Sequence, residues 1–157
     1  MSTSERRGKQ RGGSAAAAPK PHEVTTEVLR TADELRRRVA AALAPQAITS
    51  QQYNVLRILR GAYPDPLPTL EVGARMIEKT PGITRLLDRL EELELVKRVR
   101  GVEDRRLVEC RITEGGLSLL AELDEPINEV NRDAVRALTP SERRSLVRLL
   151  GIVRNLK

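Results

Sequence analysis

Hydrophobic residues recur every three or four positions along most of the chain, which is the spacing of amphipathic helices. The helices that this spacing predicts cover residues 23–44, 50–60, 70–77, 81–93, 114–137 and 140–157. The pattern changes at residues 95–100 and 107–112, where Val, Leu, Ile and Cys alternate with Lys, Arg and Glu. This alternation is typical of two strands, and Gly101–Asp104 would join them as a hairpin.

The expected helix starts carry local capping signals. Thr49 is followed three residues later by Gln52, and Thr139 by Glu142, so each pair predicts a capping box. Three further threonines are expected to cap the other helices: Thr69, Thr80 and Thr113. Pro81 is then expected to lie in the first turn of its helix, where a missing N–H costs nothing.

Glycine and proline indicate where the helices end or bend. Gly61 is expected to close the second helix as a left-handed cap. The proline-rich stretch 64–68 is expected to form a rigid turn. Pro126 lies inside the long fifth helix and should kink it, since it removes one helical hydrogen bond.

Two short helices joined by a tight turn and followed by a hairpin predict a winged helix. The fold class is therefore mainly α with a small β-hairpin wing, flanked by N- and C-terminal helices. Residues 49–112 form the predicted core, within a domain that covers residues 23–157. The flanking helices, 23–44 and 114–157, are too long for this small unit to bury, so we expect their apolar stripes to dimerise the protein.

The charge is concentrated at the N-terminus. The chain carries 28 Lys and Arg against 22 Asp and Glu, for a net charge of +6. Residues 1–22 hold five basic residues and one acidic residue, so they carry +4 of this total. Their Gly, Ser, Ala and Pro content predicts a disordered basic tail, which would either attract DNA without specificity or only keep the protein soluble.

The composition argues against several functional classes. Aromatic residues make up 1% of the chain, which argues against binding single-stranded nucleic acid by base stacking. One cysteine and one histidine provide neither a disulfide framework nor a zinc site. No catalytic constellation is present, so we expect no enzyme and no cofactor. No apolar run is long enough to span a membrane, and no secretory signal is apparent, so we expect a cytoplasmic protein.

The helix over residues 81–93 has a polar face suited to DNA. Its members are Thr80, Gly82, Thr84, Arg85 and Arg89. Arg85 and Arg89 are four residues apart and therefore lie on one side. A helix N-terminus can bind phosphate, and arginine can bond guanine bidentately. The alternative is a solvated face in which Arg85, Asp88 and Arg89 pair with one another.

The predicted hairpin is the most basic segment outside the tail. Residues 97–106 contain five basic residues against two acidic ones, including Arg100, Arg105 and Arg106. A thin arginine-bearing tip fits the minor groove, whose negative potential attracts arginine. Asp104 would then orient an arginine within the tip. The alternative is a charged edge that prevents aggregation.

Five segments together resemble the MarR (multiple antibiotic resistance regulator) family of winged-helix proteins. They are Thr49–Arg57, Thr80–Glu91, Leu95–Arg98, Asp104–Arg106 and Ile112–Gly116. The resemblance covers about residues 23–157 and implies a homodimer that binds an inverted-repeat operator in double-stranded DNA, most often as a repressor. It implies that Asp104 anchors the wing while Arg106 enters the minor groove. It also implies that a small, often phenolic, effector could release the DNA.

Two residues depart from the family pattern. Glu94 stands where the family usually has glycine, just before the first wing strand. If the helix still ends there in a left-handed residue, glutamate costs about 1 kcal/mol relative to glycine. Gly73 stands where the short helix usually has alanine, which also costs about 1 kcal/mol. Both departures suggest a looser winged domain.

A sensor site is less clearly indicated. Cys110 falls in the second wing strand, where a small packed hydrophobic residue is a better interpretation than a redox switch. Tyr53, Arg57 and Met76 are expected to line an effector pocket by their location in the resembling fold. The alternative is that Tyr53 and Met76 are core residues and Arg57 is a surface charge.

The favoured function is a sequence-specific transcriptional regulator. The alternative is a winged-helix dimer that binds another protein and does not read DNA.

Overall fold

The computed structural model describes residues 17–77, 82–100 and 108–155. Within these ranges the chain is mostly helical, with one small antiparallel sheet. Its elements in chain order are α1 (Pro21–Leu43), the 3₁₀ turn η1 (Ala44–Gln46), α2 (Ser50–Ala62), β1 (Leu67–Pro68), α3 (Thr69–Arg75), α4 (Ile83–Glu92), β2 (Val96–Arg100), β3 (Val108–Ile112), α5 (Glu114–Val135) and α6 (Pro140–Arg154). The predicted fold class, a winged helix flanked by terminal helices, is confirmed.

Threonine caps start three of the helices as expected. The Thr49 hydroxyl accepts from the Gln52 amide at 3.2 Å, and the Gln52 side chain accepts from the Thr49 amide at 2.8 Å. Thr139 and Glu142 form the same reciprocal capping box at the start of α6. Thr113 caps α5 by accepting from the backbone amide of the third helical residue. Each cap satisfies backbone donors that the first helical turn leaves unpaired.

Three predicted boundaries are wrong. Gly61 does not cap α2, because the helix continues to Ala62 and ends before Pro64, whose ring disfavours helical backbone at Tyr63. Thr69 is the first residue of α3 and not its cap, because Pro68 occupies the cap position. The next helix begins at Ile83 with Gly82 at its N-cap, so it starts two residues after Pro81.

The sheet has one strand more than the sequence pattern predicted. β2 and β3 pair as the expected antiparallel hairpin, with Val96 opposite Ile112 and Arg100 opposite Val108. β1 pairs antiparallel with the other edge of β3, so the strand order is β1-β3-β2. Leu67 and Pro68 therefore form a short edge strand instead of the end of a rigid turn, and their partner lies 41 to 43 residues later in the chain.

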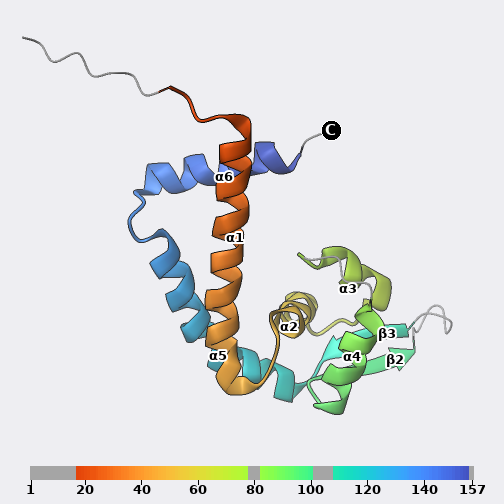
Figure 1. Ribbon diagram of the computed structural model, residues 1–157. Coiled ribbons are helices and arrows are strands. Elements are labelled where there is room, and N and C mark those ends of the chain that lie inside the picture. Colours follow the sequence, from red (N-terminus) through yellow and green to blue (C-terminus); the bar gives the residue numbers. More distant parts are fainter. Residues whose placement is uncertain (1–16, 78–81, 101–107, 156–157) are drawn as a thin grey trace, which may run out of the picture.

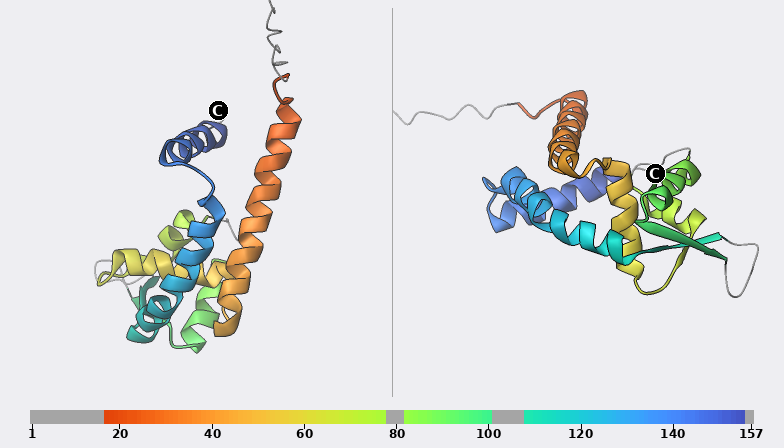
Figure 2. Two further views of the ribbon diagram at one scale, coloured as in Figure 1. Left: turned by 90° about the vertical axis from the view of Figure 1, so that its left-hand side faces the viewer. Right: turned by 90° about the horizontal axis from the view of Figure 1, so that it is seen from below.

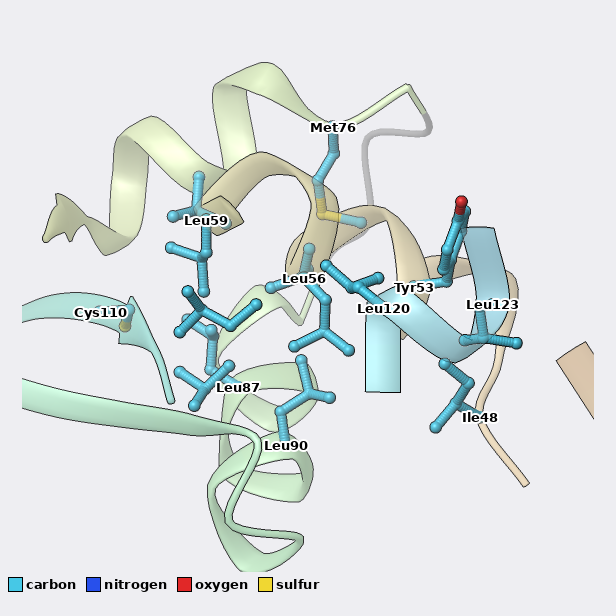
Figure 3. Packing of buried hydrophobic residues seen from close by; sticks show 14 of the residues in the cluster. Ile48, Tyr53, Leu56, Leu59, Met76, Leu87, Leu90, Cys110, Leu120 and Leu123 are labelled. Carbon is cyan, nitrogen blue, oxygen red and sulfur yellow. The ribbon is translucent and has the colours of Figure 1, made fainter. Parts of the chain in front are cut away.

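The core lies where α2, α4, α5 and the sheet meet (Figure 3). Its fully buried members include Leu56, Leu87, Leu90 and Leu120, contributed by three different helices. An ion pair at the edge of the core, Arg60 with Asp124, joins α2 to α5 through two bonds of 2.9 and 3.0 Å. Burying these leucines is the main contribution to the stability of the winged unit.

The winged unit and the terminal helices occupy different parts of the molecule (Figure 1). α1 runs beside α5, which changes direction about midway along its length, as expected for a helix that contains Pro126. α6 follows α5 and turns back, so that in Figure 1 it runs from left to right above the winged unit, and Figure 2 shows it apart from that unit. No residue of α6 within the described part of the chain is buried.

Candidate nucleic-acid interface

The helix α4 presents two chemically distinct faces. Leu87 and Leu90 are fully buried against the core. The opposite side exposes Thr84, Arg85 and Arg89 at its surface. Gly82 occupies the N-cap with φ +128°, a conformation that a side chain rarely allows. The small residue at the N-cap keeps the helix N-terminus accessible, which is what a phosphate or a base edge needs.

The alternative interpretation of this face, in which Arg85, Asp88 and Arg89 pair with one another, is not what the ion pairs of α4 show. Arg89 pairs with Glu92 at 2.8 Å, and both side chains are well exposed. Asp88 does not pair with Arg85 or Arg89, since it contacts Arg98 of β2 at 2.5 Å. An exposed pair such as Arg89–Glu92 contributes little to stability, so Arg89 can exchange its carboxylate partner for a phosphate at little cost.

The described part of the wing carries basic residues on its outer surface. Lys97 and Arg100 on β2 and Arg111 on β3 are exposed. Arg100 is the last residue of β2 and lies opposite Val108. It therefore stands at the base of the hairpin tip. Thr80, Asp104, Arg105 and Arg106 lie outside the described residues, so their predicted roles stay predictions.

Arg98 is turned toward α4, unlike its neighbours on the strand. Its guanidinium contacts Asp88 at 2.5 Å and Glu91 at 3.7 Å, and it donates to the Thr84 carbonyl at 2.9 Å. Burial opposes the charge of Arg98, but the hydrogen bond and negative charge of Asp88 outweigh it, so the pKa of Arg98 is raised. From the sequence, Arg98 was one of the five basic residues assigned to the wing, and its contacts with α4 were not predicted.

Cys110 on β3 is the cross-strand partner of Arg98 on β2, and its side chain is fully buried. Its sulfur lies 3.6 Å from the Thr69 hydroxyl, which also donates to the Val108 carbonyl at 3.0 Å. Burial raises the pKa of the Cys110 thiol, and the interaction with Thr69 and the charge of Arg98 offset only part of this shift. A buried, protonated thiol reacts slowly, as expected for a packed residue and not for a redox sensor.

The turn between α4 and β2 is built around Glu94, which has φ +58°. The Leu95 amide donates to the Leu90 carbonyl at 2.9 Å, and the Glu94 amide donates to the Glu91 carbonyl at 2.9 Å. These two bonds form a Schellman motif. The left-handed position expected here is therefore present, and it is occupied by glutamate. Thr113 ties this turn to the start of α5 through its hydroxyl, which donates to the Glu94 carbonyl at 2.7 Å.

Of the three residues predicted to bind an effector, two are buried and one is exposed. Tyr53 and Met76 are buried in the core among Leu56 and Leu120 (Figure 3). Arg57 is exposed, and its guanidinium carbon lies 5.8 Å from the centre of the Tyr53 ring. A separate open depression of about 560 Å³ lies where α1 meets α2, with a mainly apolar lining. Its lining residues are Arg36, Arg37, Ala40, Ala44, Ile48, Thr49, Ser50 and Gln51.

Other kinds of site find no support in the described residues. Over residues 17–77, 82–100 and 108–155, no group of His, Cys, Asp and Glu side chains is arranged to hold a metal ion. No helix in the same ranges is long and apolar enough to cross a membrane. The arrangement that remains is a helix N-terminus and a basic strand held side by side, which suits an extended anionic ligand.

Solved structures place this arrangement among known proteins. A MarR transcription factor from Planctomyces limnophilus is 34% identical, with a TM-score of 0.66 over 86% of this chain and 98% of that protein. A cysteine-to-serine mutant of MarR from E. coli, solved with operator DNA, is 24% identical, with a TM-score of 0.76 over 83% of this chain and 93% of that one.

A third structure, of BpsR from Bordetella bronchiseptica, concerns the regulation of DNA binding by 6-hydroxynicotinic acid. It is 19% identical, with a TM-score of 0.76 over 92% of this chain and all of that protein. No protein-family model matches the sequence. The identity to the Planctomyces protein over nearly its whole length, together with the shared winged-helix fold, shows that the chain belongs to the MarR family of transcription regulators.

Proposed function

We propose that this protein is a homodimeric, sequence-specific transcriptional repressor that binds an inverted-repeat operator. In this proposal α4 of each subunit enters the major groove, and the wing of the same subunit enters the adjacent minor groove. A small-molecule effector weakens the complex.

The observation that carries the proposal is the pairing of two exposed surfaces. The exposed face of α4 displays Thr84, Arg85 and Arg89, and the neighbouring strand β2 displays Lys97 and Arg100. A helix and a hairpin that are fixed side by side can occupy neighbouring grooves of one duplex. The operator complex of the E. coli family member supports this use of the fold.

The remaining site residues follow from this placement. Gly82 lets the start of α4 approach the DNA closely, and Thr80 precedes it in the chain. Arg105 and Arg106 are assigned to the wing tip, with Arg106 in the minor groove and Asp104 orienting it. Arg85 and Arg89 are assigned to base edges or phosphates in the major groove.

Dimerisation is supported by apolar surface that the monomer leaves uncovered. On α6, Leu146 is 41% exposed, Leu149 is 50% exposed and Leu150 is 39% exposed. α1 adds Val24 and Leu29, which are also exposed. Exposed apolar residues of this kind on two terminal helices are typical of an oligomer interface. A symmetric dimer would also match an inverted-repeat operator, with half-sites about one helical turn apart.

The effector is supported by the BpsR structure, which concerns regulation of DNA binding by 6-hydroxynicotinic acid. Tyr53, Arg57 and Met76 remain our assignment for its binding site. Because Tyr53 and Met76 are buried, an effector that reaches them has to displace core packing, and it would therefore move α2 relative to the rest of the winged unit. A phenolic ring would replace the lost apolar contacts and would use Arg57 for its polar group.

The DNA-binding proposal is tested by selecting duplexes from a random-sequence pool with the full-length protein. Fluorescence anisotropy then compares an enriched duplex with a scrambled one at two salt concentrations. A preference that persists at high salt indicates sequence readout, because binding through phosphates alone weakens steeply with salt. If no sequence is enriched, the protein does not read DNA, and a winged-helix dimer that binds another protein becomes the better interpretation.

Arg106→Ala tests the wing assignment within the same assay. We expect weaker binding, a salt slope smaller by about 0.9 and an unchanged thermal unfolding midpoint, because one contact with the DNA backbone region is lost. Arg30→Ala is the matched control, since this exposed arginine lies on α1, far along the chain from the winged unit. If the Arg106→Ala and wild-type proteins bind the duplex with equal affinity, the assignment of the wing to the interface is wrong.

The dimer is tested separately by sedimentation. Leu150→Glu places a charge in the apolar stripe of α6 and should give a monomer, whereas Arg148→Ala, on a different side of the same helix, should leave a dimer. A dimeric Leu150→Glu protein would show that α6 lies outside the interface.

A further inference from the structure

One arginine of the wing contacts the recognition helix α4 along most of its length. The guanidinium of Arg98 lies 2.5 Å from the Asp88 carboxylate and 2.9 Å from the Thr84 carbonyl. The Arg98 backbone amide donates to the Glu91 carboxylate at 3.0 Å. Thr84, Asp88 and Glu91 follow one another at intervals of four and three residues, so they form a single stripe on α4.

The stripe includes the part of α4 proposed to touch DNA. Thr84 lies in the first turn of the helix, and Glu91 is next to its last residue. Seven residues of helix span about 10 Å. Arg98 therefore holds both the DNA-proximal turn and the distal turn of α4 against the same point of β2.

The planar guanidinium is suited to this task. It carries five N–H donors in a fixed fork, so one side chain can bond the Thr84 carbonyl and the Asp88 carboxylate at once and still lie 3.7 Å from the Glu91 carboxylate. The Arg98 side chain is 26% exposed, and those of Asp88 and Glu91 are 46% and 41% exposed. Pairs that are this accessible to water contribute modestly to stability, whereas their directional geometry still restricts how α4 lies on the sheet.

The other helix of the helix-turn-helix is tied to the wing at the same level. Thr69, the first residue of α3, bonds to Val108 and contacts Cys110. Cys110 is the cross-strand neighbour of Arg98. Both helices are thus fastened to the base of the hairpin, one through β3 and the other through β2.

We infer that Arg98 is a positioning residue for operator recognition: it sets the orientation of α4 relative to the wing and does not itself contact DNA. The inference rests on the proposed function. A duplex presents its two grooves at fixed separations, so only one orientation lets the helix and the wing bind together. Without the Arg98 contacts, each element still meets DNA, but the two no longer fit the same site.

Asp88→Ala gives the sharpest test, because two explanations predict opposite signs. Removing an acidic residue from a DNA-binding surface strengthens electrostatic attraction to DNA. Removing the main partner of Arg98 loosens α4, so the positioning role predicts weaker binding to the selected duplex, by about tenfold, comparable to the loss of one base-pair contact. Glu92→Ala is the matched control: it removes the same charge from the same helix without touching Arg98, and it should bind at least as tightly as wild type.

Arg98 itself is then replaced in two ways. Arg98→Gln should lose at least about tenfold in affinity for the selected duplex, while binding of the scrambled duplex and the salt slope stay close to wild type. Arg98→Lys keeps the charge but has one ammonium nitrogen in place of the planar fork, whose two terminal nitrogens contact Thr84 and Asp88 separately, so it should not rescue specific binding. Thermal unfolding followed by circular dichroism accompanies each variant, and Asp88→Ala decides the question if the Arg98 variants do not fold.

The possible failures are distinguishable. If wild type prefers no sequence, the proposed function fails and this inference fails with it. If wild type is specific but Asp88→Ala binds its duplex as tightly as Glu92→Ala does, only the positioning role is overturned. A salt slope that falls by about 0.9 in Arg98→Gln would show that Arg98 is a phosphate contact and would also overturn it.

Discussion

The start of α5 contains a glycine whose missing side chain is required by close packing. A Cβ atom on Gly116 would lie 2.4 Å from the Leu95 carbonyl oxygen and 2.6 Å from the Ile112 side chain. Carbon and oxygen atoms in close contact are normally about 3.3 Å apart. Gly116→Ala therefore forces the turn after α4 away from α5 by about 1 Å.

The cost follows from what this movement disturbs. The Leu95 carbonyl accepts from the Thr113 amide at 3.1 Å, and each such bond contributes about 1 kcal/mol. Overpacking of a tight site adds about 1 to 3 kcal/mol. The higher helix propensity of alanine relative to glycine offsets at most about 1 kcal/mol of this cost. We expect the free energy of unfolding to fall by about 1 to 3 kcal/mol, compared with the roughly 5 to 15 kcal/mol typical of a domain.

Gly115 provides a control one residue away. A Cβ there would meet its nearest neighbours at 3.6 Å, an ordinary contact, so Gly115→Ala should be neutral or stabilise by up to about 1 kcal/mol. Urea unfolding followed by circular dichroism, at one protein concentration because the protein is proposed to dimerise, compares the two variants. If the two variants unfold at the same urea concentration with the same slope, the steric argument is refuted.

Three further substitutions test other parts of the winged unit. Glu94→Gly should raise the free energy of unfolding by about 1 kcal/mol, because glycine adopts the positive φ freely, and a lower thermal midpoint would contradict this. Gly73→Ala should stabilise by up to about 1 kcal/mol, since its Cβ would meet Ile83 at an ordinary 3.8 Å; destabilisation would show that α3 needs the glycine. Burial raises the pKa of the Cys110 thiol in the folded protein, so the thiol of the unfolded chain ionises first as the pH rises. The free energy of unfolding should therefore fall above about pH 8.5. Urea unfolding measured from about pH 7 to about pH 10 should show a smaller fall for Cys110→Ala than for wild type.

Features set by neighbouring residues were predictable from the sequence. The capping boxes at Thr49 and Thr139 depend on residues three positions apart, and both are present. Such local rules need no knowledge of the tertiary fold, so a single sequence suffices to apply them.

Features set by distant residues were missed. β1 is only two residues long, and it exists because β3 offers an unpaired edge. Thr69 was expected to cap a helix, but its hydroxyl bonds to Val108 of that same strand. A two-residue strand has no periodicity of its own, so nothing in the local pattern could have identified it.

The apolar stripes of the terminal helices show a different limit. The spacing of residues such as Leu146 and Leu150 predicted an apolar stripe that the winged unit is too small to bury, and these side chains are exposed in the single chain. Periodicity identifies the face of a helix that avoids water, but not the molecule that covers it. The uncovered face is therefore an argument for a partner and not an error in the assignment of the helix.

Charge counting failed in an informative way at the proposed interface. The acidic residues Asp88 and Glu91 weakened the case that α4 binds DNA, and Arg98 strengthened the case for the wing. Strand alternation places Arg98 and Lys97 on opposite faces of β2, so Lys97 is exposed while Arg98 meets the two carboxylates. The opposing charges neutralise each other between the two elements. The surface left for DNA is therefore less acidic on the helix and less basic on the wing than the sequence suggests, and its specificity depends more on how the two elements are oriented.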